Sequence, residues 1–266
     1  MTTTALDLLF TLVEARAFTD RDIAALAAGT TGAVRIPGFL AAADCACAVE
    51  AIENLPVVTY APERVTVKIS RFGPALNDYR APKGGVDADR YWQATDESRA
   101  IWTRSGLRPD PLAVSLECLG RAWGAAISPA TIGGRAAFGG TLREINEGAL
   151  IHFDEVVREH PKALFDQTIM AQLAFNVWIT VPSSGGKTRL WRRRWHPTDE
   201  AHREAYGYRP DVVDGHQELR LPPRLGEALL FNPANFHAVE PNPGDRRVAF
   251  AFFLGLPSTG HLAYWS

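Results

Sequence analysis

Two histidines and one aspartate in this chain could together bind a metal ion. His152 and Asp154 stand two residues apart in a strand-like stretch, so their side chains are expected on the same face. His237 follows a second strand-like stretch that ends at Phe231, and it is the candidate for the third ligand. Two imidazoles and one carboxylate on one face of a metal suit Fe(II) and leave three positions open. The pattern therefore predicts a metal centre in which these three residues are the ligands and the catalytic groups.

An arginine opens an apolar strand ten residues after His237. Alternation along residues 247–254 places Arg247, Ala249 and Ala251 on one face and bulky apolar side chains on the other. A charge followed by two small side chains would leave room in a barrel interior for a small dicarboxylate. Because a guanidinium can bind a carboxylate through two parallel hydrogen bonds, Arg247 is predicted to bind the far end of such a molecule.

A second strand shows the same division into two faces. In residues 171–180, one face carries Gln172, Asn176 and Trp178, whereas the other carries only apolar side chains. The apolar face is typical of a core, and the mixed polar and aromatic face is typical of a cavity wall. We therefore expect this strand to line the site.

The elements that must position these residues divide the chain into two parts. Helices are predicted over residues 5–17, 20–28, 41–55, 87–105 and 111–125, with one strand at 65–70. Strands separated by Gly, Pro and Asn turns are predicted over residues 141–146, 149–153, 169–181, 188–195, 217–221, 228–231 and 247–254. This order predicts an α+β protein with a mainly β core. We expect one domain, in which residues 1–130 are mainly helical wrapping and residues 131–266 form the barrel that carries the metal site.

Composition excludes several other classes of protein. The chain of 266 residues has 28 Lys and Arg against 30 Asp and Glu, and this balance argues against non-specific electrostatic binding of nucleic acid. It has no apolar run long enough to span a bilayer and no apparent signal peptide, so we expect a cytoplasmic protein without membrane contact. Three cysteines are too few for a disulfide framework. The expected partner is a small-molecule substrate, and the oligomeric state is left open, with a homodimer among the alternatives.

The motifs together resemble the Fe(II)/2-oxoglutarate-dependent oxygenases. The matching pieces are His152-x-Asp154, Gly185-Gly-Lys-Thr188, Leu230-Phe-Asn232 before His237, and Arg247. The resemblance covers about residues 65–266. It implies a double-stranded β-helix (jelly-roll, cupin-like), Fe(II) as cofactor, and 2-oxoglutarate and O2 as cosubstrates. It further implies that Arg247, Gln172, Asn176 and Thr188 bind the cosubstrate.

Within that superfamily, the chain is similar to free-standing hydroxylases and aliphatic halogenases of amino acids and N-acyl amino acids. The similarity lies in Gln172-Leu-Ala-Phe-Asn176, in the run from Gly185 to Trp195, and in Asn232…Asn235-x-His237. The halogenases replace the acidic ligand with Gly or Ala, whereas Asp154 is present here. The resemblance therefore implies hydroxylation of an unactivated C–H bond, with release of succinate and CO2. Desaturation, cyclisation and epimerisation in natural-product biosynthesis use the same site and stay open as alternatives.

Substrate contacts are predicted mainly among arginines, because a guanidinium can bind a substrate carboxylate. The candidate substrate-binding residues are Arg80, Arg158, Trp178, Arg192, Arg194 and Asn235. Two readings from other classes also remain. Two histidines and an aspartate can hold zinc in a metallohydrolase, and a cupin-like sensor could bind a metal without catalysis.

Overall fold

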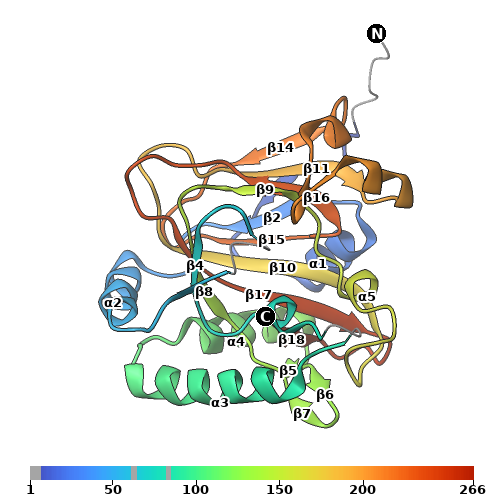
Figure 1. The fold of residues 1–266 in the computed structure, drawn as a ribbon. Coiled ribbons are helices and arrows are strands. Elements are labelled where there is room, and N and C mark those ends of the chain that lie inside the picture. Colours follow the sequence, from blue (N-terminus) through green and yellow to red (C-terminus); the bar gives the residue numbers. More distant parts are fainter. Residues whose placement is uncertain (1–6, 61–64, 82–84) are drawn as a thin grey trace.

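The computed structural model describes residues 7–60, 65–81 and 85–266, and it consists of two β-sheets with helices on the outside (Figure 1). The strands of the larger sheet are β1 (Leu12–Glu14), β2 (Ala33–Ile36), β3 (Val58–Thr59), β4 (Ile69–Phe72), β5 (Ser128–Pro129), β8 (Thr141–Ile145), β10 (Ile169–Thr180), β15 (Ala228–Phe231), β17 (Val248–Pro257) and β18 (Ala263–Trp265). Those of the smaller sheet are β9 (Ala149–His152), β11 (Thr188–Arg194), β12 (Arg203–Glu204), β13 (Gly207–Tyr208), β14 (Glu218–Leu221) and β16 (Asn235–Val239). A separate pair is formed by β6 (Thr131–Ile132) and β7 (Arg135–Ala136).

The helical elements lie mostly in the first half of the chain. The α-helices are α1 (Asp20–Ala28), α2 (Ala42–Glu53), α3 (Ala88–Ser105), α4 (Pro111–Trp123) and α5 (Val156–Glu159). The 3-10 helices are η1 (Leu76–Tyr79), η2 (Pro197–His202) and η3 (Pro210–Val213). No helix among the described residues is long and apolar enough to cross a bilayer.

The strand order brings distant parts of the chain side by side. The larger sheet has the order β1-β2-β15-β10-β17-β8-β4-β3, with β18 beside β17, and the smaller sheet has the order β12-β13-β9-β16-β11-β14. Figure 1 shows β9, β16, β11 and β14 as one layer above β2, β15, β10 and β17. The site can therefore form between the sheets, from residues that are more than 80 positions apart in sequence.

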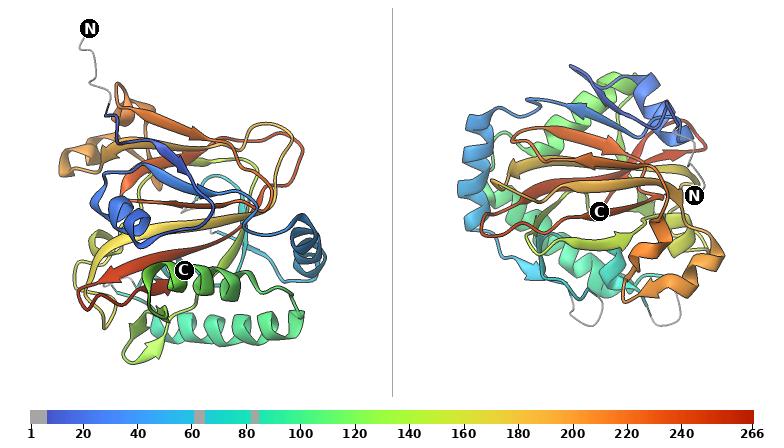
Figure 2. Two further views of the ribbon diagram at one scale, coloured as in Figure 1. Left: turned by 180° about the vertical axis from the view of Figure 1, so that it is seen from behind. Right: turned by 90° about the horizontal axis from the view of Figure 1, so that it is seen from above.

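The helices pack on the outer face of the larger sheet. The apolar faces of β10 and β17, which include Phe175 and Phe250, share one core with buried residues of α1, α2 and α4. Figure 2 shows α3 and α4 next to each other along the same side of the molecule. The division into two faces that alternation predicts for both strands is thus confirmed, and so is a mainly β core with helices outside it.

Local sequence explains why α1 and α4 begin where they do. Thr19 Oγ1 accepts a hydrogen bond from Asp22 N, and the Asp22 carboxylate accepts one from Thr19 N, which together form a capping box. Pro111 occupies the first turn of α4 after the N-cap Asp110, a position where a missing N–H costs nothing.

The helix predicted over residues 5–17 is wrong for residues 7–17, which form no helix. Residues 5 and 6 lie outside the described part. Phe10 is buried between the sheets, the Gln217 side chain hydrogen-bonds the backbone of Asp7 and Phe10, and β1 pairs in parallel with β2. Leu8 and Leu9, which suggested an apolar helical stripe, are exposed. Contacts with distant segments therefore override the local periodicity.

The region before residue 131 also holds strands that the prediction leaves out. The four residues of β2 are all buried, and three of them are apolar, so the sequence lacks the regular alternation of polar and apolar residues by which a half-buried strand is recognised. This strand pairs with β15 and is an integral part of the larger sheet. The strand predicted at 65–70 overlaps β4 only at Ile69 and Ser70, since β4 runs from Ile69 to Phe72 and residues 65–68 are not in a strand.

Candidate active site

The three predicted metal ligands lie together between the two sheets. Asp154 Oδ2 is 3.8 Å from His152 Nε2 and 3.4 Å from His237 Nε2, and all three ligand atoms lie within 4.8 Å of one another. The two imidazole rings have centroids 4.2 Å apart. These distances let one ion contact all three residues.

Neighbouring strands place the two histidines in register. His152 is the last residue of β9 and pairs directly with His237 of β16. His152 Nδ1 lies 2.7 Å from the Leu150 carbonyl oxygen, and His237 Nδ1 lies 3.0 Å from the Asn235 carbonyl oxygen. Because a carbonyl oxygen can only accept, both Nδ1 atoms carry the proton, and both Nε2 lone pairs face the metal position.

The ionisation of the site also suits a metal. Burial, followed by the charge of His237, lowers the pKa of His152 to about 4, so this imidazole is neutral at neutral pH. Burial alone would raise the pKa of Asp154, but a hydrogen bond from His237 and the charges that both imidazoles carry when they are protonated hold it below the usual range. A neutral imidazole and an ionised carboxylate are the forms that ligate a metal, so no proton has to leave these two groups first.

Asp154 is not positioned by strand alternation, as was predicted, but by a backbone hydrogen bond. The strand ends at His152, not at residue 153, so alternation does not place the aspartate. Asp154 N instead donates a hydrogen bond of 2.9 Å to the carbonyl oxygen of Pro233, in the turn between β15 and β16. The Asn232 side chain holds that turn by accepting from Ala234 N and donating to the Leu26 carbonyl. Asp154 lies beside the histidines as predicted, but strand alternation, the predicted reason, is wrong.

Arg247 lines a narrow cavity whose walls also include the metal ligands. This cavity has a volume of about 70 Å³, and its lining includes His152, His237, Ala249 and Ala251. Arg247 is only 3% exposed, and its guanidinium donates to the carbonyl oxygen of Gly186 and to Thr188 Oγ1. No carboxylate of the described residues forms an ion pair with it, and burial lowers its pKa to about 10, so it remains charged at neutral pH. A buried cation without an acidic partner indicates that an anion binds there.

Of the other residues predicted to bind the cosubstrate, two line the narrow cavity and one lines the larger cavity. Thr188 and Asn176 line the narrow cavity together with Arg247. Gly186 has a φ of 64°, and a Cβ there would lie 3.0 Å from Arg247 Cδ, which explains the glycine in the Gly185-Gly186 pair. Gln172 lies outside this cavity, in the wall of a larger one, where its Oε1 accepts from Val156 N at the start of α5.

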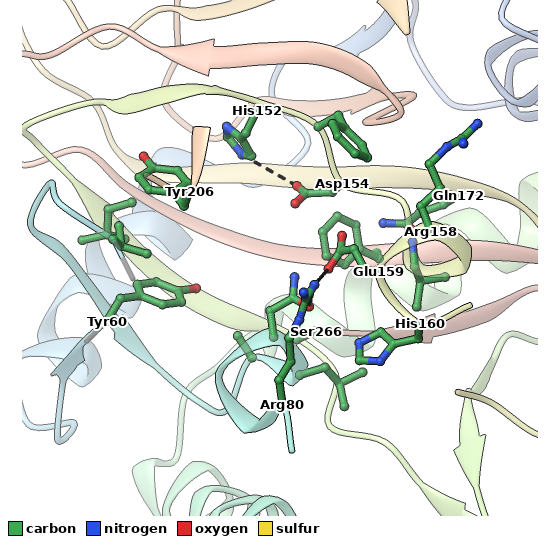
Figure 3. A pocket seen from close by; sticks show the side chains of 18 of the residues that line it. Tyr60, Arg80, His152, Asp154, Arg158, Glu159, His160, Gln172, Tyr206 and Ser266 are labelled. Atoms are coloured by element: carbon green, nitrogen blue, oxygen red, sulfur yellow. Dashed lines mark hydrogen bonds and ion pairs between the residues drawn. The ribbon is translucent and has the colours of Figure 1, made fainter. Parts of the chain in front are cut away.

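The larger cavity has a volume of about 650 Å³. His152 and Asp154 belong to the walls of both cavities. Figure 3 shows these two ligands across from Arg80 and Glu159, which form an ion pair of 2.7 Å. A cavity of this volume is typical of a site for a small molecule. The metal position is therefore the point where the narrow cavity meets the wide one.

Two of the six predicted substrate contacts line the larger cavity. Arg80 pairs with Glu159 there, and Arg158 pairs with Glu155 while lying over the Trp195 ring at 5.1 Å. Both residues are thus available to a substrate.

The other four predicted substrate contacts lie outside both cavities, so these predictions need correction. Trp178 is 1% exposed and packs behind Arg247, whose Cζ lies 5.9 Å from the indole ring. Arg192 forms an ion pair with Asp7 at the surface, and Arg194 lies against Gly29. Asn235 contributes its backbone carbonyl to His237, while its side chain donates to the Asn232 carbonyl. In each case the side chain meets another part of the chain instead of a cavity.

Sequence reasoning missed several residues of the larger cavity. Tyr60, Tyr206, Glu159 and His160 line it, and Arg143 lines both cavities. A signal for Arg143 exists, because Leu142 belongs to the core under the helices and its neighbour in an alternating strand must face the interior. The other four come from loops or from the short helix α5, where no periodicity marks a facing direction.

The fold and the site together define a class of protein. A jelly-roll with a two-histidine, one-carboxylate triad and a buried arginine in the adjoining cavity has the features of a non-heme Fe(II) oxygenase with a dicarboxylate cosubstrate.

Comparison with known proteins agrees with this class. The chain is 48% identical over 258 residues to the L-γ-glutamyl-L-propargylglycine hydroxylase of Streptantibioticus cattleyicolor, covering 97% of this chain and 96% of that protein. It is 36% identical over 135 residues to the leucinostatins biosynthesis cluster protein S of Purpureocillium lilacinum, 47% of this chain and 55% of that one. No protein-family model matches the chain.

Solved structures share the fold. An N-substituted L-amino acid dioxygenase from Burkholderia ambifaria AMMD superposes with a TM-score of 0.64 at 17% identity, covering 94% of this chain and 92% of its own. A structure of such a dioxygenase in complex with α-ketoglutarate gives a TM-score of 0.62 at 17% identity, with coverages of 93% and 91%. The chain belongs to the Fe(II)/2-oxoglutarate-dependent oxygenases. It is an enzyme whose cofactor is Fe(II) and whose cosubstrates are 2-oxoglutarate and O2.

Proposed function

We propose that this enzyme hydroxylates an unactivated C–H bond of an amino acid derivative, with γ-glutamyl dipeptides and N-acyl amino acids as the substrate class. The observation that carries the proposal is that His152 and Asp154 belong to the walls of both cavities. A substrate in the wide cavity and a dicarboxylate in the narrow one would meet at the same ion. The substrate class is supported by the name of the hydroxylase that is 48% identical over nearly the whole chain.

We further propose a role for each polar group of the site. His152, Asp154 and His237 would bind the iron, and Arg247 would bind the far carboxylate of 2-oxoglutarate with Thr188 and Asn176 beside it. Bound iron with its cosubstrates supplies hydrogen abstraction and oxygen transfer. The chain supplies orientation, through the Nδ1 hydrogen bonds that fix both imidazoles. Phe253 and Trp265, which line the wide cavity, would keep water from the reacting C–H bond.

The test is an assay of the purified enzyme with Fe(II), 2-oxoglutarate and a panel of free amino acids, N-acyl amino acids and L-γ-glutamyl-L-propargylglycine. We expect succinate formation that depends on one substrate class, and a product heavier by one oxygen atom. A product that has lost two hydrogens, or one of unchanged mass, would replace hydroxylation by desaturation or epimerisation. No substrate-stimulated succinate across the panel would contradict the proposal.

The chain is also proposed to work as one domain. Support comes from β1 and β2, which precede most of the helices yet belong to the same sheet as β10 and β17. A cytoplasmic location and a homodimer remain predictions from sequence.

A further inference from the structure

Arg143 occupies an unusual position in the wall between the two cavities. It lies in the middle of β8, where it pairs with Ala249 of β17 on one side and with Arg71 of β4 on the other. Its half-buried side chain lines both the narrow cavity and the wide one, as His152 and Asp154 do. Arg143 is therefore a cation next to the metal position, on the path between cosubstrate and substrate.

The guanidinium of Arg143 forms no ion pair with a carboxylate among the described residues, and the acidic group on which its charge acts is the metal ligand Asp154. Its one hydrogen bond there is from Nε to the neutral Thr141 Oγ1, at 3.1 Å. The other arginines of the wide cavity are each paired with a glutamate: Arg80 with Glu159, Arg158 with Glu155, and Arg203 with Glu200. A partly buried charge without a counter-charge is costly, so an isolated guanidinium in a cavity wall indicates an anionic ligand.

The side-chain charges around the iron narrow the choice of that ligand. The two charges of Fe(II) and the one on Arg247 are balanced by Asp154 and by the two carboxylates of 2-oxoglutarate. The paired arginines of the wide cavity are balanced by their glutamates. Among the side chains that the structure describes there, Arg143 is left as one uncompensated positive charge. Both carboxylates of the cosubstrate already have a partner in this arrangement, so the remaining anion is expected on the substrate.

We propose that Arg143 binds a carboxylate of the substrate beside the iron and makes the enzyme specific for amino acid derivatives in which that carboxylate is free. This inference rests on the proposed function. A guanidinium holds a carboxylate by two hydrogen bonds in one plane, so the contact fixes orientation as well as affinity. The C–H bond to be oxidised is then presented at a set position relative to the metal.

The test uses nickel-substituted, inactive enzyme with saturating 2-oxoglutarate, so that binding is measured without turnover. Calorimetry gives the Kd of L-γ-glutamyl-L-propargylglycine and of its two mono-carboxamides, for wild type and for Arg143→Gln. We expect one carboxamide to bind wild type about 10- to 100-fold more weakly than the parent dipeptide, as for loss of a charge-assisted hydrogen-bonded contact. Arg143→Gln should bind the parent dipeptide equally weakly and should no longer distinguish that carboxamide.

Three controls separate this role from a structural one. The affinity of Arg143→Gln for 2-oxoglutarate should stay within about threefold of wild type, Arg143→Lys should regain part of the preference for carboxylate, and Arg121→Gln, an exposed change on α4, should alter nothing. Wild-type discrimination retained by Arg143→Gln would overturn the inference and leave the proposed function intact. Loss of 2-oxoglutarate affinity with unchanged dipeptide affinity would also overturn it. A wild-type enzyme that binds no member of the substrate panel would overturn both.

Discussion

Replacing Arg247 with Gln should weaken the binding of 2-oxoglutarate while sparing the fold. Arg247 is 3% exposed, and it has no carboxylate partner among the described residues. A hydrogen bond between charged groups contributes about 1.5–3 kcal/mol, so its loss should raise the Kd for 2-oxoglutarate roughly 10- to 150-fold. The variant also removes a desolvated charge from the cosubstrate-free protein, so we expect no loss of stability in that state.

The assay is thermal or urea unfolding of nickel-loaded protein with and without 2-oxoglutarate. At a concentration 100 times the Kd, the ligand stabilises wild type by about 2.7 kcal/mol. If the Kd rises 100-fold, the same concentration stabilises Arg247→Gln by only about 0.4 kcal/mol. The matched control is Arg246→Gln, because the neighbouring arginine is 43% exposed and pairs with Glu144 on the outside.

A cosubstrate analogue provides an independent arm of this experiment. 2-Oxovalerate keeps the 2-oxo acid end but lacks the far carboxylate, so wild type should bind it weakly and Arg247→Gln should bind it no worse. If Arg247→Gln keeps the wild-type affinity for 2-oxoglutarate, or if Arg246→Gln loses as much, the assignment of the narrow cavity to the cosubstrate is refuted.

Three further predictions concern the metal, the pH dependence and the corrected substrate contacts. Asp154→Ala removes one of three ligands and should weaken Ni(II) binding by at least about 100-fold in calorimetry and abolish hydroxylation, whereas full activity would refute the triad. Burial, followed by the charge of Arg80, lowers the pKa of His160 from its ordinary value of 6.5 to about 4, so the unfolded chain binds an extra proton between these pH values. The free energy of unfolding of metal-free protein should therefore fall as pH drops from 6.5 to 4, by up to about 3 kcal/mol from this group, and His160→Gln should flatten the profile measured by urea titration. An unchanged profile would contradict that assignment. Arg192→Gln should leave kcat/KM within about twofold of wild type, because Arg192 pairs with Asp7 outside both cavities. The free energy of unfolding should fall by at most about 1 kcal/mol. A tenfold loss of kcat/KM would return Arg192 to the substrate site.

Much of the site could be predicted because it lies on strands whose two faces differ clearly. Along β17, the small residues Ala249 and Ala251 face the narrow cavity, and Val248 and Phe250 face the helices. This contrast is visible in the sequence, and it correctly places Arg247 inside. The resemblance in residue types around His152 and His237 supplies the rest of the centre.

The remaining features depend on contacts that no local pattern reveals. Asp154 is positioned by the Pro233 carbonyl, which comes from a turn 79 residues later. Trp178 shares a face with Asn176, yet it lies beyond the end of the cavity, because alternation gives direction but not depth. The N-terminal segment does not follow its own helical periodicity, since β1 pairs with β2 and Phe10 packs in a core cluster with Ala33 of that strand.

Dioxygen labelling tests the central claim most directly. The enzyme is supplied with Fe(II), 2-oxoglutarate, its substrate and isotopically labelled O2, and the products are analysed by mass spectrometry. Oxidation at the His152, Asp154 and His237 centre predicts one labelled oxygen in the hydroxylated product and one in succinate. An unlabelled product, or a product formed without succinate, would contradict the account.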